Sequence, residues 1–150
     1  MGLEKEINQK KFRNDSHKLG INIIYTFNWL NSYNVTLLKP FKITTQQFNV
    51  LRILRGQHPG TASIKLVRER MLDKMSDASR IVEKLRVKGY LERNICINDR
   101  RSCEVLITVK GLKLLDSIDK SNHLFDEIFL TLNKSEIRQL NILLDKLRGN

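Results

Sequence analysis

Cysteine, histidine and catalytic motifs are scarce in this chain of 150 residues. The two cysteines, Cys96 and Cys103, are too few for a disulfide framework or for the four ligands of a structural zinc site. The three histidines are scattered along the chain, and it contains no nucleophile motif, phosphate loop or dinucleotide fingerprint. We therefore expect no metal, no cofactor and no enzymatic activity.

Long apolar runs are also lacking. The most apolar stretch, residues 21–30, is interrupted by Asn22, Thr26 and Asn28, and a bilayer span needs roughly 18 to 20 apolar residues. Three of the first six residues are charged, and no apolar segment of a secretory signal follows them. The sequence predicts a soluble, cytoplasmic protein with no membrane partner.

Acidic residues are few relative to basic ones. The chain has 27 Lys and Arg against 16 Asp and Glu, a formal net charge of +11. Such an excess favours polyanionic partners, either nucleic acid or an anionic membrane surface. The excess lies within residues 1–113, whereas residues 114–150 are close to neutral. We therefore expect the C-terminal segment to have a role other than binding a polyanion.

Two prolines and seven glycines leave no flexible linker, so residues 1–150 are expected to form a single, mainly helical domain. A long first helix is predicted up to Pro40 by apolar residues at three- and four-residue spacing: Leu19, Ile23, Phe27 and Leu30. Thr44 and Gln47 have the spacing of a capping box, which predicts a second helix that ends by Arg55.

A third helix is predicted over residues 62–70, followed by a turn over residues 72–75. Ser76 is the expected N-cap of the next helix, which Gly89 ends. Apolar side chains share one face of this helix, and the opposite face collects hydrogen-bonding side chains: Asp77, Ser79, Arg80, Glu83 and Lys84. A recognition helix has this form, although a solvated helix surface explains the same pattern.

Apolar and polar residues alternate on both sides of residues 98–101, which predicts a β-hairpin with a charged tip. Thr108 can cap a further helix that runs toward Phe129, and a last helix is expected to start near Ser135.

A helix followed by a basic hairpin can contact both grooves of a DNA duplex. The helix fits the major groove, and an arginine at the hairpin tip can enter the minor groove. In this arrangement Asp99 orients Arg101, and Arg100 meets a phosphate. An Asx turn that closes the hairpin is the alternative explanation of Asp99.

Three groups of residues resemble the wing, the second helix and the recognition helix of the multiple-antibiotic-resistance regulator (MarR) family. They are Asp99-Arg100-Arg101 with Val105, Ile107-Thr108 and Gly111; Thr44 with Gln47-Phe48 and Val50-Leu51; and Ser79-Arg80 with Val82, Leu85 and Gly89. The resemblance covers about residues 44–115. The turn over residues 72–75 departs from it, because this turn lacks the glycine often found there.

The resemblance implies a mainly α-helical winged helix-turn-helix with a small β-hairpin. The DNA-binding lobe would cover about residues 44–110, and dimerisation helices would cover about residues 1–39 and 111–150. The implied function is that of a ligand-responsive repressor, which binds a pseudo-palindromic operator in double-stranded DNA as a homodimer. The expected DNA contacts are Ser76, Asp77, Ser79, Arg80, Lys84, Asp99, Arg100 and Arg101.

The alternative hypothesis is that the winged helix binds other proteins and has no role in binding DNA. It predicts an apolar outward face on the helix after Ser76, and binding that is indifferent to salt.

The last helix has more apolar surface than a terminal helix over one small domain needs. Its apolar residues gather on one side: Ile137, Leu140, Leu143, Leu144 and Leu147. They pack either against the first helix of the same chain or, as the resemblance implies, against helices of a second copy.

Aromatic residues concentrate before and within the second helix, where the resemblance implies a pocket for a small aromatic or anionic effector. The candidate pocket residues are Tyr25, Trp29, Tyr33, Phe48 and Arg52. Plain core packing is the other explanation of this aromatic stripe.

Cys96 and Cys103 flank the hairpin loop and could lie opposite one another. A thiol switch is one interpretation, and two small apolar residues in a reducing compartment is the other.

Overall fold

The computed structural model describes residues 2–95 and 103–149. Its elements, in chain order, are α1 (Leu3–Glu6), α2 (Asp15–Leu38), the 3-10 turn η1 (Lys39–Phe41), α3 (Thr45–Arg55), β1 (Ala62–Ser63), α4 (Ile64–Arg70), α5 (Ala78–Val87), β2 (Leu91–Ile95), β3 (Cys103–Ile107), α6 (Val109–Asp119), α7 (Asn122–Glu127) and α8 (Lys134–Leu147). The three strands form one antiparallel sheet in the order β1-β3-β2. The predicted fold class, mainly α with a small β-hairpin, is confirmed.

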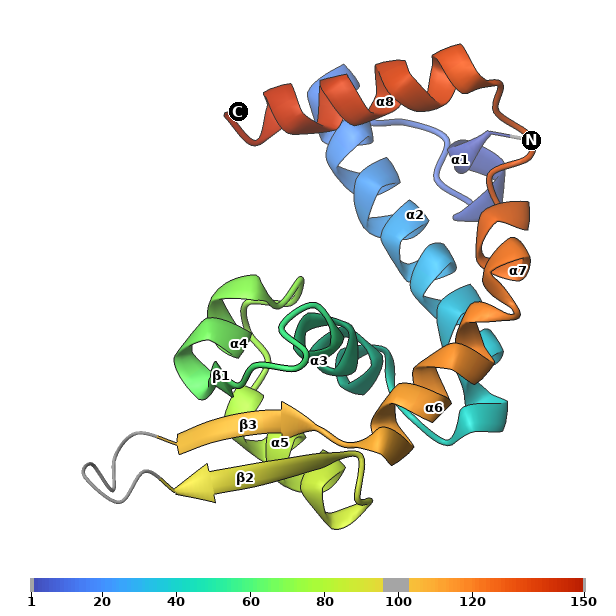
Figure 1. Ribbon diagram of the computed structural model, residues 1–150. Helices are drawn as coiled ribbons and strands as arrows, with labels where there is room; N and C mark the ends of the chain where they lie inside the picture. Colours follow the sequence, from blue (N-terminus) through green and yellow to red (C-terminus); the bar gives the residue numbers. More distant parts are fainter. Residues whose placement is uncertain (1, 96–102, 150) are drawn as a thin grey trace.

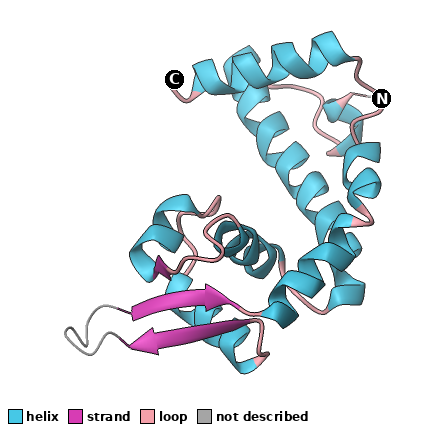
Figure 2. Ribbon diagram, in the orientation of Figure 1, coloured by secondary structure: helices cyan, strands magenta, loops and turns pink. Residues whose placement is uncertain are grey.

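The helices gather at two ends of the molecule (Figures 1 and 2). At one end α3, α4 and α5 pack with the sheet to form a lobe. At the other end lie α1, α8 and the first part of α2. The chain passes between the two ends twice, through the C-terminal part of α2 and η1 and through α6 and α7 (Figure 1).

Two helices begin at the N-cap residues predicted from the sequence. Thr44 Oγ1 accepts from the Gln47 amide, and Gln47 Oε1 accepts from the Thr44 amide, both at 3.1 Å, so the capping box of α3 is confirmed. Thr108 caps α6 by accepting from the Gly111 amide at 3.1 Å. Beyond α5, Gly89 takes a positive φ of 76°, which glycine adopts without strain.

Other boundaries differ from the sequence prediction. Residues 62 and 63 form β1 and not the start of a helix, because they pair with Val105 and Glu104 of β3. The helix predicted to run toward Phe129 is two helices, α6 and α7, broken at residues 120–121. The last helix starts at Lys134, near Ser135 as predicted, and its N-cap is Asn133 in a capping box with Glu136.

The N-cap of α5 is Asp77 and not Ser76. Asp77 Oδ1 accepts from the Arg80 amide at 3.0 Å. The Ser76 hydroxyl instead donates to Asp73 Oδ2 at 2.7 Å, so it stabilises the preceding turn.

The partner of Cys103 across the β2-β3 ladder is Ile95. Cys96 lies outside the described residues.

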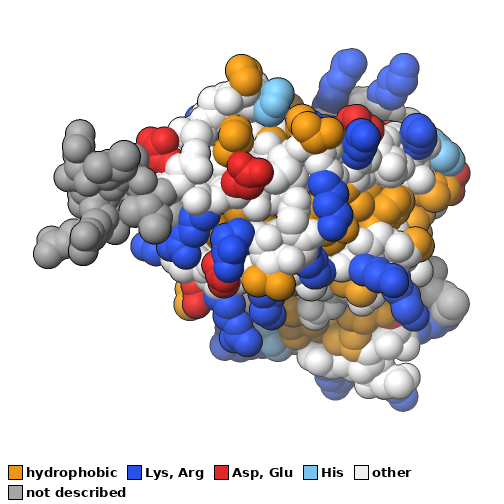
Figure 3. Space-filling view, turned by 60° about the horizontal axis from the view of Figure 1, so that its bottom comes forward, with side chains coloured by type: hydrophobic (Ala, Val, Ile, Leu, Met, Phe, Trp, Pro, Cys, Tyr) orange, Lys and Arg blue, Asp and Glu red, His pale blue; other side chains and the backbone are white. Residues whose placement is uncertain are grey.

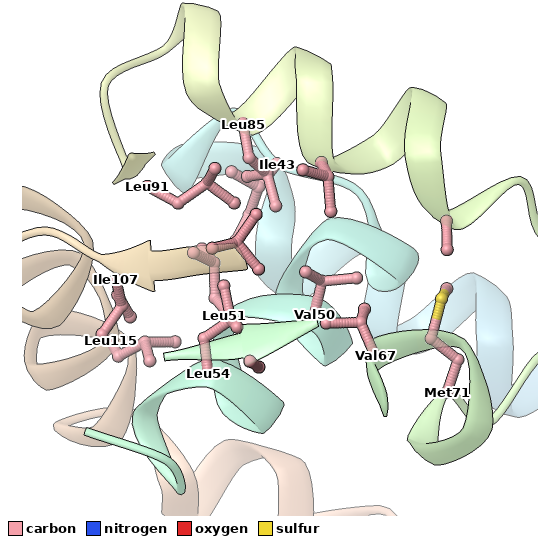
Figure 4. Close-up of a cluster of buried hydrophobic side chains, with 14 of the residues drawn as sticks. Ile43, Val50, Leu51, Leu54, Val67, Met71, Leu85, Leu91, Ile107 and Leu115 are labelled. Atoms are coloured by element: carbon pink, nitrogen blue, oxygen red, sulfur yellow. The ribbon is translucent and has the colours of Figure 1, made fainter. Parts of the chain in front are cut away.

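The hydrophobic core lies in the lobe and not among the terminal helices (Figure 4). Val50, Leu51 and Leu54 of α3 form its centre, with less than 2 % of each residue exposed. Burying a leucine or valine side chain of this kind stabilises a fold by about 1.5–3 kcal/mol. Residues of α4, α5, the sheet and α6, together with Leu38 of α2 and Ile43, complete the cluster. The orientation of α5 is therefore fixed by burial of one of its faces.

Gly111 offers a test of how closely α6 approaches the sheet. A Cβ at this position would lie 2.3 Å from the Tyr90 carbonyl oxygen and 2.8 Å from Ile107 Cγ1. We expect Gly111→Ala to lower the free energy of unfolding by about 1–3 kcal/mol, because backbone has to move. Urea denaturation at fixed protein concentration measures this change.

Gly20→Ala is the matched control. Gly20 is also helical but, unlike the buried Gly111, it is exposed, and a Cβ there meets nothing within 4 Å. We expect this variant to be as stable as the parent, or more stable by about 0.5–1 kcal/mol. Equal stability of the two variants would contradict the close approach at Gly111.

Candidate nucleic-acid interface

Helix α5 presents a polar face directly opposite its buried one. Ala78, Val82 and Leu85 lie in the core with almost no exposed surface. Among the predicted contact residues, Ser79, Arg80 and Lys84 are exposed on the outer side. These side chains supply a hydroxyl group and two cations, which can meet base edges or phosphates.

The turn between α4 and α5 is organised by Asp73, a residue that sequence reasoning did not select. Its Oδ1 accepts from the Met75 amide at 3.0 Å, and its Oδ2 accepts from the Ser76 hydroxyl at 2.7 Å. Hydrogen bonds from Ser76 and then from the Met75 amide hold the pKa of Asp73 below its ordinary value. The carboxylate therefore stays ionised at neutral pH and closes the turn without a glycine. The sequence signal that could have identified Asp73 is that of an Asx turn, in which an Asp side chain accepts a hydrogen bond from the amide two residues later.

Glu83 links α5 to the hairpin. Its carboxylate accepts from Arg86 Nε at 3.0 Å and Nη2 at 2.7 Å, and it lies 3.7 Å from Arg93 Nη1 of β2. The hydrogen bonds from Arg86 lower the pKa of Glu83, and the charge of Arg93 adds to this effect. The Glu83 carboxylate is thus engaged by two arginines of the same chain. Its ion pair with Arg93 helps to set the position of β2 relative to α5.

The hairpin itself is present with a continuous register from Leu91 opposite Ile107 to Ile95 opposite Cys103. Its predicted tip contacts, Asp99, Arg100 and Arg101, lie outside the described residues. Their proposed contacts with DNA therefore rest on the sequence.

Cationic side chains are exposed on α5 and on the segment before it. Lys65, Arg68 and Arg70 of α4, which packs against α5, and Lys74 of the turn are exposed, as are Arg80 and Lys84. Figure 3 shows one face of the molecule on which lysine and arginine outnumber acidic side chains. A polyanion can approach such a surface with a favourable electrostatic free energy.

Two of the five predicted effector residues contact α7, and a third lies near one of them. The Tyr33 hydroxyl donates to the Leu124 carbonyl oxygen at 2.7 Å, and the Phe48 ring stacks on Phe125 with centroids 6.0 Å apart. The Arg52 guanidinium lies 5.7 Å from the centre of the Phe48 ring. Tyr33 and Phe48 are thus both engaged with α7.

The other two predicted effector residues lie farther along α2. Tyr25 is half-buried and Trp29 is exposed. Neither residue lines the groove described next.

A groove of about 810 Å³ lies where α2, η1, the start of α3 and the end of α5 meet. Four lysines line it, Lys39, Lys42, Lys84 and Lys88, together with the apolar side chains of Val35, Ile43 and Val87. Lys88 is already engaged, because its Nζ donates to the Lys42 carbonyl oxygen at 2.7 Å and to Gln47 Oε1 at 3.3 Å. Sequence reasoning missed this groove because its lysines come from separate elements.

Two helices expose apolar side chains that nothing in the described chain covers. In α2 these are Leu19, Ile24, Phe27, Trp29 and Val35, and in α8 they are Ile137, Leu140, Ile142, Leu143 and Leu147. No residue of α8 is buried. In the described residues, α8 therefore does not form part of the hydrophobic core.

Within residues 2–95 and 103–149, no group of three or more His, Cys, Asp and Glu side chains could hold a metal ion. In the same ranges, no helix is both long enough and apolar enough to span a membrane.

Solved structures share this architecture. A MarR-like transcription regulator from Bacillus cereus superposes with a TM-score of 0.80 at 23% identity, over 90% of this chain and 96% of that one. The chain has the fold of the MarR regulators. A cysteine-to-serine mutant of MarR from E. coli, in complex with operator DNA, gives a TM-score of 0.80 at 24% identity, over 92% and 99% of the chains.

A third similar structure is BpsR of Bordetella bronchiseptica, whose DNA binding is regulated by 6-hydroxynicotinic acid. It gives a TM-score of 0.78 at 23% identity, over 87% of this chain and 98% of that one. No protein-family model matches the chain. The MarR resemblance predicted from the sequence is thus confirmed in the fold.

Proposed function

We propose that this protein is a sequence-specific regulator of transcription that binds double-stranded DNA and catalyses no reaction. The observation that carries the proposal is the exposed polar and cationic face of α5, held in place by the Asp73 turn and by the ion pair between Glu83 and Arg93. In a winged helix-turn-helix, the helix in this position enters the major groove. The MarR fold and the operator complex of one neighbour support this assignment.

The predicted contact residues fall into groups according to whether their side chains already form hydrogen bonds within the protein. Ser79, Arg80 and Lys84 are the residues that we assign to bases and phosphates. Ser76 and Asp77 are engaged in the turn and the helix cap, so we assign them mainly to orienting α5. Asp99, Arg100 and Arg101 keep the minor-groove role that the sequence predicts, with Arg101 inserted and Asp99 bracing it.

Arg80→Ala tests the DNA-binding proposal. We expect the variant to bind a duplex of about 30 base pairs, taken from the DNA that flanks its own gene, at least fivefold more weakly, because a guanidinium contact to a base or phosphate is worth about 1–3 kcal/mol. Fluorescence anisotropy at several salt concentrations measures the change, and binding by the parent should weaken as salt rises.

Arg13→Ala, an exposed arginine before α2, is the control and should bind DNA as the parent does. Parent affinity in Arg80→Ala would exclude α5 as the reading helix. Salt-independent binding would favour the protein-interaction alternative.

We also propose that the protein is a homodimer, with α2 and α8 as the dimerisation helices and α3 to β3 as the DNA-binding lobe. Exposed apolar faces of this size on a folded chain mark an interaction surface. The near-neutral charge of residues 114–150 permits two copies to approach there. A two-fold axis would pair two α5 helices on a pseudo-palindromic site.

Leu140→Glu tests this interface. Leu140 shares the apolar side of α8 with Leu144 and Leu147, whereas Ile142 lies on the opposite side and is even more exposed, 65% against 48%. We expect Leu140→Glu to convert a dimer into a 17.6 kDa monomer in sedimentation velocity at micromolar concentration. Ile142→Glu should remain dimeric. A monomeric parent protein would refute the proposal.

We further propose that the protein is a repressor that an anionic aromatic effector releases from DNA. The lysine-lined groove offers positive charge and apolar lining side chains, whereas Tyr33 and Phe48 are engaged in contacts with α7. A ligand that binds better to the conformation unable to bind DNA shifts the population toward it.

The effector site is tested with 2-naphthoate as an anionic aromatic probe and with uncharged 2-naphthalenemethanol for comparison. We expect the double variant Lys39→Gln, Lys42→Gln to bind 2-naphthoate at least fivefold more weakly in calorimetry, because two cations are lost. Arg52→Gln tests the pocket predicted from the sequence. A loss in Arg52→Gln alone would place the effector beside Phe48.

A further inference from the structure

The turn between α4 and α5 exposes two large apolar side chains. Leu72 is 86% exposed and Met75 is 93% exposed, more than any other large apolar residue among the described ranges. Their neighbour Met71 is 1% exposed and lies in the core. The turn therefore separates an inward apolar residue from two that point into solvent.

This exposure is built into the turn. The Leu72 amide donates to Asn49 Oδ1 of α3 at 2.9 Å, and the Met75 amide donates to Asp73 Oδ1 at 3.0 Å. Both backbones are thus held in place while both side chains remain free. Turns ordinarily use polar residues at such positions, and exposed large apolar residues mark contact surfaces.

The surroundings of the two side chains indicate a polyanionic partner. Arg70 and Lys74 are exposed within the same segment, and Arg80 follows one turn into α5. A purely apolar protein partner would have to bury these cations. A DNA duplex neutralises them with phosphates and still offers an apolar group in the major groove, the C5-methyl of thymine.

We propose that Met75 and Leu72 contact thymine methyl groups where α5 enters the major groove, and that they make the protein prefer thymine at those positions. This inference rests on the proposed function and adds a specificity determinant to it. Met75 precedes the N-cap Asp77 by two residues, so it lies at the end of α5 that a recognition helix directs at the bases. The flexible thioether side chain of methionine can adjust to a methyl group.

Deoxyuridine substitution tests the proposal, because it removes only the methyl group of thymine. Duplexes of about 30 base pairs are selected with the parent protein from a random pool, and each thymine is replaced in turn. We expect a loss of about fourfold in affinity at one or two positions of each half-site, the value for one buried methyl group. Met75→Ser should bind the thymine duplex more weakly and show no further loss with deoxyuridine at the position that Met75 contacts, whereas any loss at a position that Leu72 contacts should remain.

Two control variants complete the experiment. Met75→Leu keeps an apolar side chain and should retain most of the preference for thymine. Leu130→Ser removes a leucine that is 78% exposed between α7 and α8, and it should leave the preference unchanged. Thermal denaturation of Met75→Ser should match the parent, because the Met75 side chain has almost no buried surface.

The outcomes separate this inference from the proposed function. Selection of no duplex would refute DNA binding itself. Salt-dependent, sequence-specific binding with equal deoxyuridine losses in the parent and in Met75→Ser, or with no loss at any position, would refute the methyl contact alone.

Discussion

Burial of one face of α5 against α3 is the constraint on which the rest of the site depends. Val82 and Leu85 have no exposed surface, and they face Val50, Leu51 and Leu54 across the lobe core. Because a helix turns once in 3.6 residues, this packing leaves Ser79, Arg80 and Lys84 on the outer side. The candidate reading surface is therefore a geometric consequence of the hydrophobic core, and the Asp73 turn fixes where it starts.

Local signals explain what could be predicted from the sequence. The capping box of Thr44 and Gln47 and the cap at Thr108 depend on residues three positions apart, so both were predictable. Ser76 was predicted as a cap wrongly, because its hydroxyl is taken by Asp73 and the neighbouring Asp77 can cap as well. The strand β1 was missed because its partners on β3 lie about forty residues away.

The candidate site likewise has parts that the local sequence predicts and parts that depend on tertiary contacts. Polarity at helical spacing was enough to select Ser79, Arg80 and Lys84, since it needs no tertiary information. The ion pair of Glu83 with Arg93 and the lysine-lined groove join side chains from different elements, and no periodicity predicts such meetings. Tyr33 and Phe48 were selected for a pocket, but their contacts with α7 arise from the path of the chain after α6.

Lys84 belongs both to the outer face of α5 and to the wall of the groove. An anion held in the groove lowers the positive potential that this lysine offers to a phosphate. A phosphate at Lys84 lowers its attraction for the anion to the same extent, because coupling between two binding sites is reciprocal. Effector and DNA can therefore oppose each other through one side chain, in addition to any change in the spacing of two α5 helices.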